Sequence, residues 1–116
     1  MIPQQGLKTR QNGAELVEFQ CDESDIATSS AAALDQGKFQ GVVVKNGTGD
    51  YTITVNRVSK RTLTVVSLIP LTANLQPQLV SVSTSAVNFK FTNNSGSAVD
   101  TDFHASFLRY DSIQER

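Results

Sequence analysis

The chain has 116 residues, of which ten are basic and eleven acidic, and its formal net charge is −1. This length fits one domain, and so small a net charge supplies no long-range field that would attract DNA or RNA. Charged residues make up 18% of the chain, and Ser, Thr, Asn and Gln supply much of its polar surface. Such a surface suits packing against other protein, because few charges must be desolvated.

Residues 1–14 form a polar arm whose only large apolar side chains are Ile2 and Leu7. This content is too small for the arm to fold alone. We therefore expect the arm to become ordered only on the surface of a partner chain. Its candidate partner-binding residues are Ile2, Pro3, Leu7, Lys8 and Arg10.

Three absences bear on where the chain is made. The start of the chain lacks the apolar core of a signal peptide. The longest apolar stretches are far shorter than a membrane span. Cys21 is the only cysteine, so an intrachain disulfide is impossible. We expect synthesis in a reducing cytoplasm and no membrane partner.

The chain after the arm begins with a predicted strand over residues 15–21, in which apolar side chains alternate with polar ones. Residues 22–37 are predicted to be a long connection with one short helical turn. Asp22 or Ser24 can cap the start of a helix, and Gly37 can end one. Residues 31–34 are also good helix formers.

From residue 38 to residue 110 the pattern has a period of two, which puts alternate side chains into a core and into water. Residues 46–50 contain Gly and Asn and predict a tight hairpin. The predicted strands cover residues 39–45, which we expect to be buried, 51–58, 62–70, 79–83, 87–92 and 103–110. The predicted aromatic core consists of Phe89, Phe91, Phe103 and Phe107.

Seven or so short strands at this spacing predict an all-β fold, an antiparallel β-sandwich of jelly-roll-like type. The sandwich occupies residues 15–110. An extended N-terminal arm, residues 1–14, precedes it, and a polar C-terminal tail, residues 111–116, follows.

Few residues offer catalytic or metal-binding chemistry. His104 shares a predicted strand with Ser106 and follows Asp102, but residues two apart on a strand lie side by side and do not oppose each other as a nucleophile and its base must. The acidic residues 22–25 lack the spacing of a calcium loop and are interpreted as a turn or helix start, with weak divalent-ion binding as the alternative. The basic residues 57–61 are interpreted as a solvated turn, or as a salt bridge to a neighbouring subunit. We predict no enzyme, no cofactor and no metal site.

Two segments, Gly47-Thr-Gly-Asp-Tyr-Thr-Ile-Thr-Val55 and Asp102-Phe-His-Ala-Ser-Phe-Leu108, resemble small β-sandwich modules of tailed-bacteriophage particles. Such modules serve as head decoration (cement) proteins or as the ends of tail fibres. The resemblance implies a structural virion protein on the capsid surface, a homotrimer that binds and stabilises the phage head through the major capsid protein. The chain's own Met1 favours decoration over a fibre end. The alternative is a tail-fibre or receptor-binding module that recognises a host surface carbohydrate.

Overall fold

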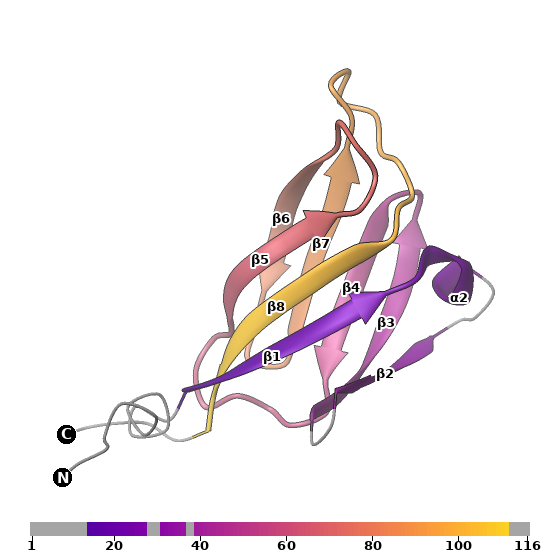
Figure 1. The fold of residues 1–116 in the computed structure, drawn as a ribbon. Helices are drawn as coiled ribbons and strands as arrows, with labels where there is room; N and C mark the ends of the chain where they lie inside the picture. The colour runs from indigo at the N-terminus through magenta and orange to yellow at the C-terminus, as the bar shows by residue number, and fades with distance from the viewer. Residues whose placement is uncertain (1–13, 28–30, 37–38, 112–116) are drawn as a thin grey trace, which may run out of the picture.

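In a computed structural model the chain is an all-β sandwich, and the structure describes residues 14–27, 31–36 and 39–111 (Figure 1). One antiparallel sheet has three strands in the order β1-β8-β5, and the other has five in the order β2-β3-β4-β7-β6. The predicted antiparallel β-sandwich is thus confirmed. Its elements are β1 Ala14–Cys21, α2 Glu23–Ala27, β2 Ala32–Gln36, β3 Phe39–Gly47, β4 Asp50–Val55, β5 Thr64–Pro70, β6 Gln76–Val82, β7 Ala86–Thr92 and β8 Phe103–Tyr110.

The first and last strands pair along their whole length. β1 runs antiparallel to β8, from Ala14 opposite Tyr110 to Cys21 opposite Phe103. The inward side chains of β1 are Val17, Phe19 and Cys21, all buried as the alternation predicts. The two ends of the described chain therefore lie side by side at one end of the sandwich.

The segment between β1 and β3 differs in part from expectation. The predicted helical turn is present as α2, and Ile26 anchors it in the core. The helix-forming residues 31–34, however, belong to strand β2, which pairs antiparallel with β3. Pairing supplies these residues with ladder hydrogen bonds and buries Leu34, so tertiary context overrides helix propensity.

The inner faces of the two sheets meet in an aromatic core. All four predicted phenylalanines have an exposed fraction of 0%. Tyr51, Phe89, Phe91 and Phe103 contact one another, with ring centroids 4.8 to 6.2 Å apart. At the other end of β8, Phe107 packs against Phe19 with centroids 6.4 Å apart. Tilted and edge-to-face pairs of this kind add to the area that each ring buries.

Strand β3 is less buried than its run of valines suggests. Val43 is 1% exposed, but Val42 on the outer face is 38% exposed. The expectation of a buried strand therefore holds for the inner face of β3 and fails for its outer face. β3 belongs to a sheet that has a second sheet on one face only, so its side chains alternate between core and solvent.

The hairpin between β3 and β4 depends on Gly49. Its φ of +66° lies in the left-handed region, which glycine tolerates. A Cβ atom there would come within 2.7 Å of the backbone N and O of Val99. The close approach also holds two hydrogen bonds, because Phe91 N donates to Gly49 O at 2.9 Å and Gly49 N donates to Asp100 Oδ1 at 2.6 Å. The hairpin is thereby fixed to the β7–β8 connection.

Gly49→Ala should destabilise the domain, by roughly 1–3 kcal/mol for the left-handed backbone and further because Val99 must move. Gly47→Ala is the matched control, since nothing lies within 4 Å of its Cβ position and its φ is ordinary. We expect denaturant unfolding to show a large loss for the first variant and little change for the second. Equal midpoints for the two variants would contradict the proposed role of Gly49.

Phe107→Ala should lower the free energy of unfolding by roughly 3–5 kcal/mol, because it leaves a cavity in the fully buried core. Leu16→Ala, at a position 47% exposed on β1, should change it by less than about 1 kcal/mol. Thermal or denaturant melts of the two variants test this. A Phe107→Ala protein that melted with the wild type would mean that the register of β8 is wrong.

Candidate assembly surface

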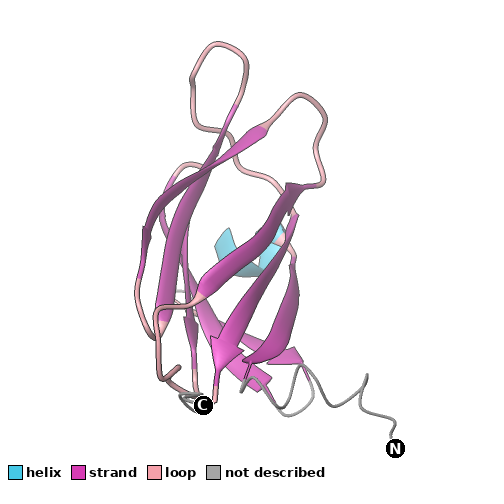
Figure 2. Cartoon of the chain, turned by 90° about the vertical axis from the view of Figure 1, so that its left-hand side faces the viewer, coloured by secondary structure: helices cyan, strands magenta, loops and turns pink. Residues whose placement is uncertain are grey.

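One lateral side of the sandwich is formed by two edge strands, one from each sheet. β5 ends the three-stranded sheet and β6 ends the five-stranded sheet. The connection of residues 71–75 joins them, so both rims lie on the same side of the molecule (Figure 1). Figure 2 turns this side toward the viewer. We call it the β5–β6 side, residues 64–82.

Large apolar side chains gather on the β5–β6 side. Within the described part of the chain, eight large apolar side chains are exposed, and five of them lie between residues 66 and 80. Four of these five are more than half exposed to solvent. They are Val66 at 52%, Ile69 at 48%, Leu71 at 53%, Leu79 at 51% and Val80 at 53%.

Each of the two edge strands contains an irregularity at a valine. The β5–β8 register shifts between Val65 and Ser67, and the β6–β7 register shifts between Leu79 and Ser81. Val66 and Val80 are thus the extra residues of two β-bulges. Bulges twist an edge strand away from regular pairing. Both strands nonetheless expose an apolar side chain at the bulge itself.

The core is incompletely closed along this side. Leu79 pairs with buried Phe89 in the ladder and shares its inward face, yet Leu79 is 51% exposed. Four more apolar residues here pack against the core while remaining only partly buried: Val65, Leu68, Leu75 and Val82. β6 is an edge strand of the five-stranded sheet, and six of its seven residues are exposed, so the three-stranded sheet covers β6 only in part.

The β5–β6 side also lacks charge. From Thr62 to Phe89 the sequence contains no Asp, Glu, Lys, Arg or His. Edge strands usually carry charged side chains, which prevent them from pairing with a strand of another chain. The opposite edge strand of the smaller sheet, β1, follows this rule with Glu15 and Glu18. The sequence analysis missed the uncharged stretch because it read each strand separately, although a simple scan for charges would have found it.

A polar cluster on another part of the domain joins α2 to the β3–β4 hairpin. Lys45 Nζ donates to Asp100 Oδ2 at 2.7 Å and to Glu23 Oε2 at 3.0 Å. The Tyr51 hydroxyl donates to the other oxygen of Glu23 at 2.5 Å, and Thr101 N donates to the Tyr51 hydroxyl at 3.3 Å. The cluster therefore connects three segments that are far apart in the sequence: α2, the β3–β4 hairpin and the β7–β8 connection.

The charges in this cluster are fixed and not poised for proton transfer. Hydrogen bonds to Asp100 and Glu23 raise the pKa of Lys45. Burial, with the hydrogen bond to Glu23, raises the pKa of Tyr51. For Asp100, burial alone would raise the pKa, but hydrogen bonds from Lys45 and Gly49 outweigh it and lower the pKa. Near neutral pH Lys45 and Asp100 are therefore charged and the Tyr51 hydroxyl is neutral, and their hydrogen bonds hold α2 and the β7–β8 connection to the hairpin.

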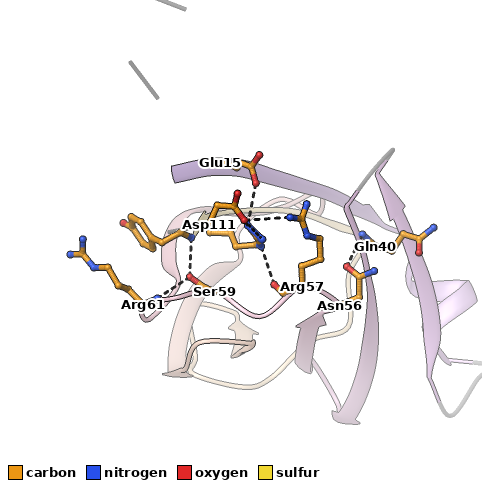
Figure 3. Close-up of polar contacts among 9 residues, drawn as sticks. Glu15, Gln40, Asn56, Arg57, Ser59, Arg61 and Asp111 are labelled. Atoms are coloured by element: carbon orange, nitrogen blue, oxygen red, sulfur yellow. Dashed lines mark hydrogen bonds and ion pairs between the residues drawn. The ribbon is translucent and has the colours of Figure 1, made fainter. Parts of the chain in front are cut away.

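A second cluster lies where β1 begins and β8 ends (Figure 3). Arg109 is 3% exposed and donates to Glu15 Oε1 at 3.1 Å and to Asp111 Oδ1 at 2.8 Å. It also donates from Nε to the carbonyl of Arg57 at 3.0 Å. This guanidinium ties β1, β8 and the β4–β5 connection together.

The β4–β5 connection holds the basic residues that the sequence analysis singled out. Ser59 Oγ accepts hydrogen bonds from Tyr110 N at 2.9 Å and from Arg61 N at 3.3 Å (Figure 3). Arg61 also lies over the Tyr110 ring, 4.9 Å from its centroid. Arg57 pairs with Asp111 of the same chain at 3.3 Å. A salt bridge from this exposed connection to a neighbouring subunit stays a prediction.

The candidate catalytic group is not assembled. Asp102 Oδ1 accepts a hydrogen bond from Glu23 N at 2.7 Å and so holds the start of α2. The hydroxyls of Ser106 and Ser67 share a hydrogen bond, with their Oγ atoms 2.7 Å apart. His104 lies on the outer face of the smaller sheet, opposite Gln20 and Ile69.

The described residues form no cluster of potential metal ligands, and their cysteine is buried. The acidic residues 22–25 form the start of α2, and no group of three His, Cys, Asp or Glu side chains in the described ranges could hold a metal ion. Cys21 is buried, and burial raises the pKa of its thiol to about 12. A thiol with so high a pKa carries almost no thiolate.

The predicted partner-binding residues of the arm lie outside the described residues. These are Ile2, Pro3, Leu7, Lys8 and Arg10. Their contact with a partner stays a prediction. In the part of the chain that the structure describes, no helix has the length and apolar character needed to cross a membrane. Comparison with models of protein families, with curated proteins and with solved structures returned no match to this chain.

Asp100→Asn should make the free energy of unfolding depend less on pH in the acid range. The folded-state pKa of Asp100 is lowered from 3.8, so its ionised form stabilises the fold at neutral pH, and this stabilisation is lost as the pH falls below 3.8. The pKa of Asp22 is also lowered, by hydrogen bonds from Ser24, so a smaller decline should remain. Urea unfolding across a pH series tests this. Glu18→Gln, an exposed change on β1, should keep the wild-type decline, and an Asp100→Asn decline as steep as wild type would refute the assignment.

Proposed function

We propose that the chain is a structural virion protein, a decoration protein that attaches as a homotrimer to the head of a tailed phage and stabilises it. The observation that carries the proposal is the β5–β6 side, which is uncharged and exposes apolar residues over an incompletely closed core. Monomeric domains rarely leave large contiguous apolar patches in water. Protein interfaces have apolar centres from which charged residues are depleted.

The attachment is additive in this proposal. Each arm makes a weak contact with the major capsid protein, and linking three arms in one trimer converts the second and third contacts into local events at high effective concentration. The arm precedes Ala14, which lies opposite Tyr110 beside the Arg109 cluster. The rigid base of the arm thus sets where it leaves the domain.

The alternative is a receptor-binding module of a tail fibre that recognises a host carbohydrate. Sugar rings are commonly bound against exposed aromatic side chains. Six aromatic side chains of this domain are less than 2% exposed and serve the core: Phe19, Tyr51, Phe89, Phe91, Phe103 and Phe107. This use of the aromatic residues favours the decoration proposal.

Co-sedimentation with undecorated phage heads, assembled from the major capsid protein encoded with this chain, tests the function. The full-length protein should pellet with the heads, while a variant lacking residues 2–12 should bind at least ten-fold more weakly because each arm contact is lost. Its melting should match wild type, since the β1–β8 ladder begins at Ala14.

A length-matched control, Ile2→Ser with Leu7→Ser, separates the apolar anchors from the mere presence of an arm and should also bind weakly. Full-length protein that failed to pellet at any concentration would sink the decoration function. Equal binding by the shortened protein would leave decoration possible and refute the role of the arm.

A further inference from the structure

We propose that the β5–β6 side is the contact between copies of this chain, with the β5 rim of one copy packed against the β6 rim of the next in a closed ring. The ring size of three rests on the proposed function. The occupant of this surface is therefore a second copy, and the major capsid protein binds elsewhere.

The charge pattern favours a second copy as the occupant. Between Arg61 and Lys90 the chain carries no charge, so two copies that meet here bring no like charges together. An interface with a different protein is usually selected by complementary charges, which steer the encounter and reject wrong partners. The β5–β6 side has no charge with which to select a foreign partner.

The geometry favours a ring over a single pair. Each strand has seven residues, which gives rims about 23 Å long at roughly 3.3 Å per residue. A contact along one strand of this length buries less surface than the ~800 Å² that each partner contributes to a standard interface. In a ring every copy uses both rims, β5 toward one neighbour and β6 toward the other, so closure doubles the contact per subunit.

The position of the chain ends restricts the direction of the symmetry axis. Ala14 and Tyr110 lie together at one end of the sandwich, and the arm leaves from there. A symmetry axis parallel to the β5–β6 side places the end from which the arm leaves on the same side of the ring in every copy. Every arm then faces the same shell. A twofold axis perpendicular to that direction would turn the two arms to opposite sides.

The bulges define the kind of contact. Val66 and Val80 interrupt the regular hydrogen-bonding rows of β5 and β6. A continuous ladder of backbone hydrogen bonds between subunits is therefore disfavoured. The contact consists of side-chain packing that covers Val66, Ile69, Leu79 and Val80 and completes the cover over the partly exposed core residues.

Sedimentation velocity and light scattering of three lysine variants test the interface. Val66→Lys changes β5, Val80→Lys changes β6, and Leu16→Lys on β1 is the control at a similarly exposed apolar position, 47% against 52% and 53%. Wild type and Leu16→Lys should have three times the 12.6 kDa mass of the chain. The other two variants should have the mass of one chain. All three should keep the far-UV circular dichroism of a folded domain, because each replaced side chain is exposed in the single chain. The two monomeric variants should melt below wild type, because they lose the stabilisation that assembly gives.

A mixture of the two monomeric variants tests the head-to-tail arrangement. The Val66→Lys chain keeps an intact β6 rim and the Val80→Lys chain an intact β5 rim, so together they can form one wild-type contact. At high protein concentration the mixture should show a greater average mass than either variant alone. A mixture that stayed monomeric would overturn head-to-tail contact.

The outcomes separate this inference from the proposed function. An oligomer that survives Val66→Lys and Val80→Lys, or that Leu16→Lys dissociates, overturns the inference while leaving shell binding intact. A wild-type trimer with the expected variant pattern that does not pellet with heads supports the inference and overturns decoration. A wild-type protein that stays monomeric both in solution and on heads overturns the inference and the trimer, and one that also fails to pellet with heads overturns decoration as well.

Discussion

The unequal size of the two sheets is the constraint from which the surface of this domain follows. A sheet of three strands packs on a sheet of five, and β6 at the edge of the larger sheet is covered only in part. Apolar side chains on the inner face of β6 are therefore half exposed to solvent. Leu79, which pairs with buried Phe89, is 51% exposed. An isolated domain would remedy this with a longer loop or a charged edge. This chain has no charged residue within residues 64–82, and in the proposed ring a second copy of the chain supplies the missing cover.

The same core is firmly closed elsewhere, which makes the open side a local feature. The ring of Tyr51 lies in the aromatic cluster, and its hydroxyl donates a hydrogen bond to the carboxylate of Glu23. Through Glu23 and Lys45 this one side chain connects the core to α2 and to the loop that carries Asp100. Arg109 performs a similar task at the end where the arm begins. Stability is thus concentrated away from the β5–β6 side.

The sequence predicted what depends on local periodicity and failed where distant segments decide. Alternation identified the core positions of β1, β7 and β8, because a strand with one buried face must repeat every two residues. It misassigned residues 31–34, since β2 forms only by pairing with β3. The ion pair of Lys45 with Asp100 joins residues 55 positions apart and has no local signal. The uncharged side was visible as composition, but only the sheet order shows that β5 and β6 share one side.

The distribution of charge separates two tasks on one small domain. Charged side chains stand on β1, on α2, in the β4–β5 connection and near the arm, where they form ion pairs within the chain. Charge on an edge strand such as β1 resists unplanned strand pairing. The side without charge has only bulges and the prolines Pro70 and Pro77 to limit such pairing. Bulges and prolines prevent an endless ladder but still allow side chains to pack, and this combination suits a contact that closes into a small ring and then stops.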